Sequence, residues 1–278
     1  MSESKIPYED IGGQGPTLHF AHANAYPPGS YRQLLTRLSR DFRVLAIKFR
    51  PLWPGSNPEE MNSWHDIAQD LILFLDQMKL SGVIGVGHSL GAVTTMMAAH
   101  LRPDLFDALV FIEPVFLPPA VIAHFTGKQS TDPYDIPLST IALKRRHHWV
   151  TRQEAFEHFR KKQVFARWSD QALREYMTAG LEPDGHGEFE LAFPPAWEAW
   201  IYAHPPRTAW DLIPQVAHPT LGIRGVETDT LVQEAWEEWR EEQPAARFIE
   251  VADAGHLLPM EKPDRVADLI VEFLSALS

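Results

Sequence analysis

Apolar runs and helical stripes alternate along the first 113 residues of the chain. The runs expected to form buried strands are residues 17–22, 42–49, 81–86 and 108–112. The segments with the apolar spacing or content of helices are 31–39, 64–78 and 92–101. Regular alternation of this kind predicts an α/β fold, in which helices cover both faces of a mostly parallel sheet.

This alternation stops near residue 117 and resumes after residue 206. The intervening segment has prolines near both ends and short helical patterns rich in arginine, histidine and aromatic residues. Beyond it, 219–224 and 246–251 read as strands, 231–242 reads as a helix, and an amphipathic helix closes the chain. We therefore expect a core made of 1–116 and 207–278, with 117–206 inserted as a helical cap. A cap inserted at this point would lie over the carboxyl ends of the strands, where ligands of parallel sheets bind.

Residues 87–91 read Gly-His-Ser-Leu-Gly and lie between an expected strand and an expected helix. Strand, sharp turn and helix form the nucleophile elbow, which raises a serine hydroxyl above the edge of a sheet. The backbone at such a serine is strained, and glycines two residues to either side relieve the crowding. Ser89 is therefore the predicted nucleophile. The side chain of His88 is expected to point into the core, so we leave it out of the catalytic group.

A serine nucleophile needs a base to take its proton and a carboxylate to orient that base. In the chain order serine, acid, histidine, the acid should follow one late strand and the histidine should follow the next. Asp229 and His256 meet these conditions. Glu227 lies in the same loop as Asp229, and Glu113 follows the strand after the elbow helix, so both remain alternatives for the acid.

Stabilisation of an oxyanion requires two N–H groups beside the nucleophile. The first is expected from Leu90, the residue after Ser89. The second should come from the loop after strand 17–22, where Asn24 is preferred and Ala25 is the alternative.

Composition narrows the range of partners. The 25 basic and 37 acidic residues give a formal charge of −12, which disfavours binding to nucleic acid or to an anionic membrane. The chain has no cysteine, so disulfides, thiolate metal sites and a cysteine nucleophile are excluded. The first residues lack the pattern of a signal peptide, and no apolar run approaches the length of a membrane span. We expect a soluble, cytoplasmic protein with a small-molecule substrate; its oligomeric state stays open.

With these motifs in place, the chain resembles the α/β-hydrolase superfamily over nearly its whole length. The resemblance rests on the 22–24 loop, the 87–91 elbow, the 224–229 loop and Gly255-His256. Residues 184–198 also resemble the end of the cap in esterase-like and carbon–carbon hydrolase members. The resemblance implies Ser89, Asp229 and His256 as the triad, with no cofactor and no metal. The chain departs from many members in having His22-Ala23 in place of His-Gly.

Three functions are compatible with these residues and with the resemblance. The preferred one is hydrolysis of a small carboxylic ester, or a related acyl compound, through an acyl-enzyme. The second is carbon–carbon bond hydrolysis of a dienoic acid, for which the arginine-rich cap would bind the carboxylate. The third is a catalytically silent binding protein on the same fold; the presence of all three triad residues weighs against it. A serine nucleophile argues against haloalkane or epoxide chemistry, which would call for an aspartate.

Overall fold

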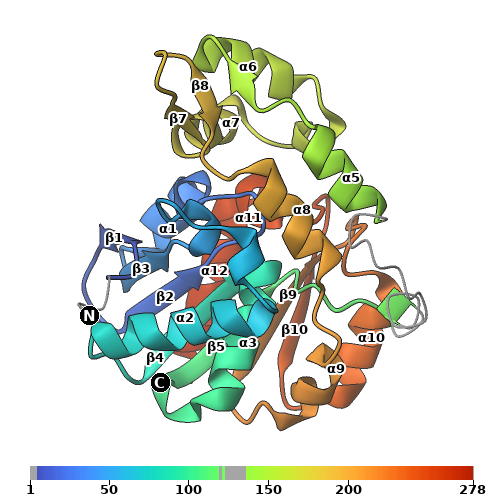
Figure 1. Cartoon of the computed structure of the whole chain (residues 1–278). Helices are drawn as coiled ribbons and strands as arrows, with labels where there is room; N and C mark the ends of the chain where they lie inside the picture. The colour runs from blue at the N-terminus through green and yellow to red at the C-terminus, as the bar shows by residue number, and fades with distance from the viewer. Residues whose placement is uncertain (1–4, 119–120, 123–135, 278) are drawn as a thin grey trace.

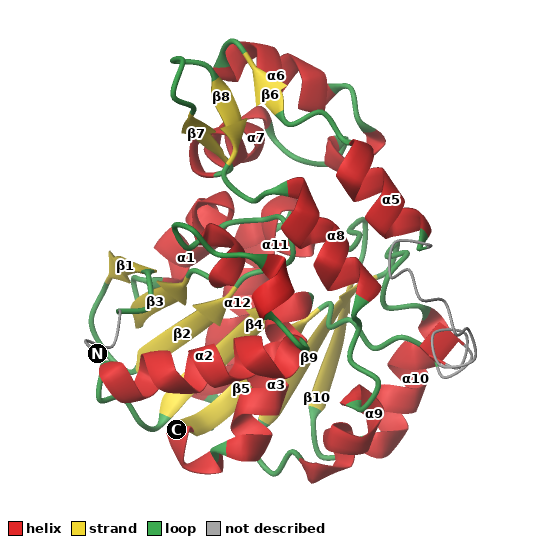
Figure 2. Cartoon of the chain, in the orientation of Figure 1, coloured by secondary structure: helices red, strands yellow, loops and turns green. Residues whose placement is uncertain are grey.

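A seven-stranded sheet forms the centre of the computed structural model, which describes residues 5–118, 121–122 and 136–277 (Figures 1 and 2). Strand β1 is antiparallel to β3, and the other neighbours are parallel. In spatial order the strands are β1 (Tyr8–Gly12), β3 (Arg43–Ile47), β2 (Thr17–Ala21), β4 (Val83–His88), β5 (Phe106–Ile112), β9 (Thr220–Gly225) and β10 (Arg247–Val251). The predicted fold class, a mostly parallel sheet with helices on both faces, is confirmed.

Helices cover the two faces of this sheet and bury one hydrophobic cluster on each side. In Figure 1, α2 and α3 lie in front of the sheet and α12 lies behind it. The helices of this part are α1 (Arg32–Leu38), α2 (Trp64–Gln77), α3 (Leu90–Leu101), α9 (Ala209–Leu212), α10 (Gln233–Glu242), α11 (Leu258–Glu261) and α12 (Pro263–Ser275). The ends of the parallel strands that precede α3, α10 and α11 therefore meet at one edge of the sheet.

Local sequence signals account for where these elements begin. Ser63 caps α2 through a capping box with Asp66, as the spacing of these two residues predicts. Pro263 occupies the first position of α12, where its missing N–H costs nothing. Helix α3 is buried on nearly every side, which agrees with its apolar sequence of small residues.

The described residues 136–206, which we call the insertion, form a lobe above the sheet in Figure 1. Its helices are α5 (Pro137–Lys144), α6 (Arg152–Arg160), α7 (Asp170–Ala179) and α8 (Pro195–Ala203). The insertion also contains a three-stranded antiparallel sheet, made of β6 (His148–Trp149), β8 (Phe189–Leu191) and β7 (Leu181–Pro183). The sequence predicted helices alone here, because strands of two or three residues are too short to show a period.

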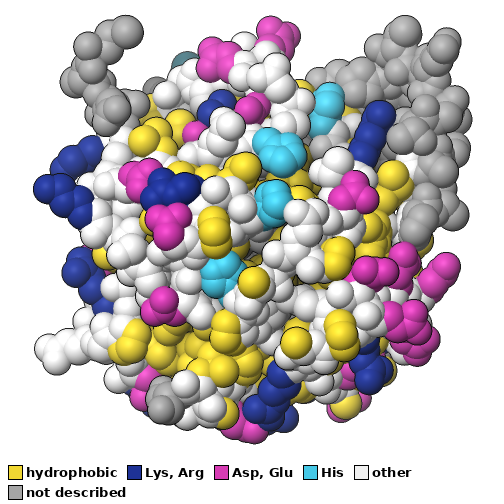
Figure 3. Space-filling view, turned by 90° about the horizontal axis from the view of Figure 1, so that it is seen from below, with side chains coloured by type: hydrophobic (Ala, Val, Ile, Leu, Met, Phe, Trp, Pro, Cys, Tyr) yellow, Lys and Arg dark blue, Asp and Glu magenta, His cyan; other side chains and the backbone are white. Residues whose placement is uncertain are grey.

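The face of the molecule drawn in Figure 3 carries both acidic and basic side chains. On the face seen in Figure 3, lysine and arginine side chains are separated from one another by acidic, hydrophobic and uncharged side chains. Among the described residues, every helix is too short or too polar to cross a membrane.

We expect His19 to make the stability of the fold depend on pH. His19 is fully buried on β2 beside Phe74, and burial lowers its pKa from 6.5 to about 3. Between these values the unfolded chain binds a proton that the native state excludes. His19 therefore does not affect the free energy of unfolding above about pH 6.5, where it is neutral in both states. Below this pH the free energy of unfolding falls, by up to about 1.4 kcal/mol per pH unit.

Replacing this histidine should therefore flatten the acid limb of the stability profile. In His19→Leu, the slope of the unfolding free energy against pH, between about pH 4 and 6, should fall by about one proton. Urea denaturation at several pH values measures this slope. An unchanged slope would show that His19 is charged in the native state or already neutral in the unfolded chain.

Candidate active site

Ser89 occupies the turn between β4 and α3, with φ 56° and ψ −117°. A positive φ is uncommon for a residue other than glycine and costs of order 1–3 kcal/mol. The surrounding structure holds this conformation, in part through a hydrogen bond from the Ser89 N–H to the Ile112 carbonyl at 3.0 Å. The strained elbow predicted for Ser89 is present.

The two glycines of the elbow are required by close backbone contacts. A Cβ atom on Gly87 would collide with the backbone of Gly91 and Ala92. A Cβ atom on Gly91 would collide with the carbonyl groups of Ala21 and His22. The first turn of α3 thus lies directly against the end of β2, which brings the loop after β2 beside the nucleophile.

His256 lies between Ser89 and a buried carboxylate. Its Nε2 is 3.0 Å from Ser89 Oγ, and its Nδ1 is 3.1 Å from Oε2 of Glu113. The loop that carries His256 follows β10 and is held by a hydrogen bond from the Gly255 N–H to the Glu261 carboxylate. Ser89, His256 and Glu113 therefore form one continuous chain of hydrogen-bonding groups.

Glu113 directly follows β5 and is fully buried. Besides His256, its carboxylate accepts hydrogen bonds from the Gly225 N–H and the Thr228 hydroxyl, both at 2.6 Å. Its backbone has a φ of 49°, and its N–H donates to the Ile223 carbonyl. Each carboxylate oxygen therefore has a fixed donor from the β9 side, so a buried charge is fully satisfied.

The structure does not bring Asp229 to His256, and this corrects the prediction of the acid. Asp229 is exposed, and its carboxylate accepts a hydrogen bond from the neighbouring Thr230 hydroxyl. Glu227 is also exposed and pairs with Arg167 of the insertion. The prediction was wrong because β5 and β9 are neighbours whose carboxyl ends meet at the same edge, so sequence order alone did not separate their loops. The available signal was a glutamate immediately after a fully apolar strand.

The predicted oxyanion donors lie at the start of α3 and in the loop after β2. Leu90 is the first residue of α3, so its N–H has no partner within the helix. Asn24 is buried in the loop after β2, and its Nδ2 donates to the Glu198 carbonyl of α8 at 3.2 Å. The next residue, Ala25, has a φ of 65°, and its carbonyl accepts from the Tyr176 hydroxyl of α7 at 3.5 Å. The insertion therefore contacts the loop on which Asn24 and Ala25 lie.

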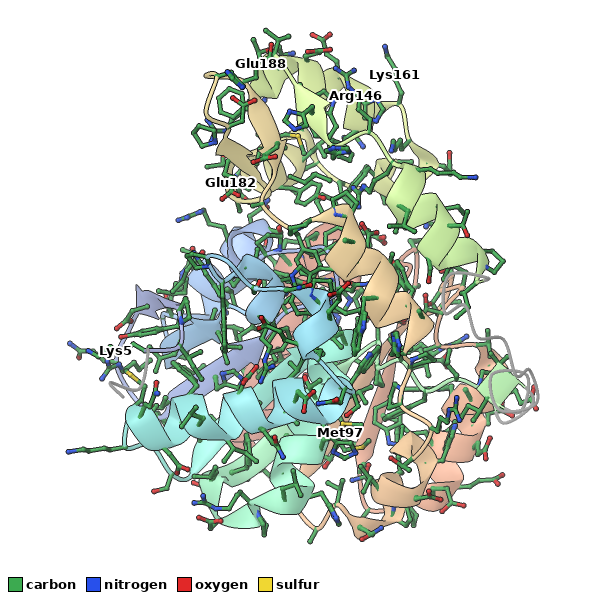
Figure 4. The ribbon with its side chains drawn as sticks, in the orientation of Figure 1. Lys5, Met97, Arg146, Lys161, Glu182 and Glu188 are labelled. Atoms are coloured by element: carbon green, nitrogen blue, oxygen red, sulfur yellow. The ribbon has the colours of Figure 1, made fainter. Side chains whose placement is uncertain are left out.

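An ion pair between a half-buried arginine and a buried glutamate lies on the side of the insertion that faces this loop. Arg145 follows α5 and pairs with the Glu198 carboxylate of α8. Burial raises the pKa of the Tyr176 phenol, and the positive charge of Arg145 opposes this shift. Tyr26, which is in ring contact with Tyr176 at 5.5 Å, comes from the same loop as Asn24. Other charged residues of the insertion, Arg146, Lys161 and Glu188, lie on its part farthest from the sheet in Figure 4.

Among the described residues, one group of side chains has the composition of a metal site. The possible ligand atoms of His148, Asp184 and Glu188 lie within 4.8 Å of one another. Asp184 accepts the N–H groups of His186 and Glu188, which lowers its pKa, and His148 lies 3.3 Å from Glu190. These contacts hold the turn between β7 and β8. The group shares no residue with the Ser89 site.

Comparison with known proteins identifies the family. Residues 20–269 match the model of the alpha/beta hydrolase family. The chain therefore belongs to the alpha/beta hydrolase family, as the elbow and the sheet indicate.

Individual relatives share the length of the chain at low identity. Esterase YbfF of Escherichia coli is 25% identical over 239 residues, covering 86% of this chain and 85% of the relative. The 2-(acetamidomethylene)succinate hydrolase of Mesorhizobium japonicum is 25% identical over 272 residues, covering 95% and 90%. A crystal structure of E-2-(acetamidomethylene)succinate hydrolase superposes with a TM-score of 0.81 at 21% identity, covering 97% of this chain and 98% of that one. At this low sequence identity, the superposition shows that the two proteins share a fold.

Proposed function

We propose that this protein is a serine hydrolase that cleaves a small carboxylic ester, or a related acyl compound, through an acyl-enzyme. The observation that carries the proposal is the chain from Ser89 through His256 to Glu113, with distances of 3.0 and 3.1 Å. The esterases among the relatives support the same reaction class. On this proposal the acid is Glu113, Asp229 has no catalytic role, and residues 117–206 act as a cap over the site.

The reaction then assigns a chemical role to each residue of the site. His256 Nε2 takes the proton of Ser89 as Oγ attacks the substrate carbonyl, and Glu113 stabilises the resulting imidazolium. The N–H groups of Leu90 and Asn24 bind the oxyanion of the tetrahedral intermediate. His256 gives the proton to the departing alcohol, which leaves an acyl group on Ser89. Water, deprotonated by His256, then attacks the acyl-enzyme. His256 returns this proton to Ser89 Oγ as the acyl–oxygen bond breaks and the carboxylic acid leaves.

A fluorophosphonate probe tests the activation of Ser89. We expect the folded wild-type protein to be labelled, and peptide mass spectrometry to place the label on Ser89. Ser89→Ala serves as the control and should remain unlabelled while melting at the wild-type temperature. Hydrolysis of an aryl acetate should disappear with the label.

Failure of the wild-type protein to react would favour the silent binding protein. A folded protein that takes no label and hydrolyses no aryl ester has a serine that is not activated. Labelling at another residue would contradict the assignment of Ser89.

A second candidate is a substrate that carries a carboxylate, with carbon–carbon hydrolysis as the reaction. The observation that favours it is Arg145, a half-buried cation paired with Glu198, whose backbone carbonyl accepts from Asn24. One relative is named as a hydrolase of 2-(acetamidomethylene)succinate, and succinates are carboxylate anions. In this candidate Arg145 would exchange part of its contact with Glu198 for the substrate carboxylate.

Rates on two substrates separate the candidates. A higher kcat/KM on a simple aryl ester than on a ring-fission dienoate supports ester hydrolysis, and the reverse supports the second candidate. For the dienoate, Arg145→Gln should raise KM more than it lowers kcat, because a binding contact is removed. An equal effect on the neutral ester would assign Arg145 to the structure of the insertion.

A further inference from the structure

His88 is a fully buried titratable residue that the proposed mechanism does not use. It ends β4 and directly precedes the nucleophile, and its ring points to the face of the sheet covered by α1 and α12. The prediction that His88 points into the core is thus confirmed. Both of its ring nitrogens have partners: Nδ1 lies 2.8 Å from the Tyr31 hydroxyl, and Nε2 lies 2.8 Å from the carbonyl oxygen of His256.

The directions of these hydrogen bonds follow from the groups involved. A carbonyl oxygen only accepts, so the His88 proton lies on Nε2 and is donated to His256. Nδ1 is then an acceptor, so the Tyr31 hydroxyl donates to it. The Tyr31 oxygen in turn accepts the N–H of Ala23 at 3.0 Å. One chain of hydrogen bonds therefore runs from the Ala23 N–H through Tyr31 and His88 to the His256 carbonyl.

This chain joins three backbone segments that meet at the Ser89 site. Ala23 precedes Asn24 in the loop after β2, His88 precedes Ser89 at the elbow, and His256 follows β10. The two ends of this series of hydrogen bonds are main-chain groups, so the series fixes the positions of backbone atoms. We propose that Tyr31 and His88 are positioning residues, which hold the Asn24 loop and the backbone of His256 at fixed places relative to Ser89. This proposal rests on the proposed serine hydrolase function.

The state of charge of His88 suits this task. Burial lowers its pKa well below the ordinary value, and the neighbouring His256 adds to the effect. A neutral ring keeps one donor and one acceptor, whereas a protonated ring would present an N–H to both partners. His22 fixes the other side of the same loop: the Phe49 N–H donates to its Nε2, and its Nδ1 donates to the Ala23 carbonyl at 2.8 Å.

Variants that break the chain at either half should slow the reaction without weakening substrate binding. Tyr31→Phe removes the hydroxyl and leaves the Ala23 N–H unpaired, and His88→Leu removes both ring contacts. We expect each to lower kcat on an aryl acetate by about 10- to 100-fold with KM within about twofold, because misplaced donors and base act in the transition state. The rate of fluorophosphonate labelling should fall in parallel.

Two further variants distinguish positioning from a loss of general stability. His88→Gln retains an amide N–H that can reach the His256 carbonyl, and it should recover kcat to within about fivefold of the wild type. His19→Leu is the matched control: His19 is buried on neighbouring β2, and neither of its ring nitrogens has a hydrogen-bond partner among the described residues. It should leave kcat within about twofold of the wild type.

Nitrogen-15 NMR of the wild-type imidazoles tests the chain without any substitution. At pH 7, His88 should be neutral with its proton on Nε2; protonation of Nδ1 would overturn the proposal even where a variant fails to fold. A wild-type protein that neither labels nor hydrolyses the ester would overturn the proposed function, and the inference with it. A labelled wild type with unchanged kcat in folded Tyr31→Phe and His88→Leu would overturn the inference alone.

Discussion

Glu113→Gln should lower kcat by about 10³- to 10⁴-fold, the order expected when the carboxylate that orients a catalytic histidine is replaced by an amide. The loss has two causes. The amide carries no charge to stabilise the imidazolium of His256. In addition, its NH2 group must face a donor, because Gly225 N–H points at one carboxylate oxygen and His256 Nδ1 lies at the other. Either orientation places two donors together or forces the wrong tautomer of His256.

Asp229→Asn is the matched control for this experiment. The same change of charge at an exposed carboxylate that accepts a hydrogen bond from Thr230 should leave kcat within about threefold. Steady-state hydrolysis of an aryl acetate, with the melting temperature of each variant, measures both. A large loss in Asp229→Asn with little change in Glu113→Gln would return the acid to the loop after β9.

Gly91→Ala should destabilise the fold by about 3 kcal/mol or more, at the upper end of the effects of overpacking. The new Cβ would overlap the carbonyl groups of Ala21 and His22, which are backbone atoms. Ala21 pairs with Gly87 in the centre of the sheet and cannot move away without breaking that ladder. The crowding therefore has no flexible side chain to absorb it.

Urea denaturation and thermal melting measure this loss. Gly185→Ala is the matched control, because a Cβ at Gly185 meets nothing within 4 Å. It should change the free energy of unfolding by less than about 0.5 kcal/mol. Equal stability of both variants would mean that α3 can shift away from β2, and the close approach of these elements would not be needed for the elbow.

The sequence predicted best the parts of the molecule that depend on local patterns. Apolar runs located β2, β3, β4, β5, β9 and β10, and helical stripes located α1, α2 and α12. The elbow was predictable because the Gly-x-Ser-x-Gly spacing reflects a local clash, now seen between a Cβ atom on Gly87 and the backbone of Gly91 and Ala92. His88 is buried, as predicted, together with every other residue of β4.

The parts that were missed depend on contacts between distant segments. Glu113 and Asp229 both follow strands of the same sheet, and only the placement of Gly225 and Thr228 around Glu113 distinguishes them. Likewise, the chain of hydrogen bonds through Tyr31 and His88 joins residues up to 233 positions apart, from 23 to 256. A pattern along one segment carries no information about such pairings.

The position of Glu113, the proposed acid, also affects the order in which the site is completed during synthesis. Ser89 and Glu113 belong to one β4–α3–β5 unit, and the Ser89 N–H is bonded to Ile112, the residue before Glu113. The backbone that carries Ser89 and Glu113 can therefore form as soon as these two neighbouring strands pair, while the ribosome is still making the insertion. The Glu113 carboxylate gains its donors from Gly225 and Thr228 only after β9 and the loop that follows it have been made. His256 is added only with the last tenth of the chain. On the proposed mechanism, the growing polypeptide holds its serine without a base, and it becomes reactive only when the final strand and its loop dock.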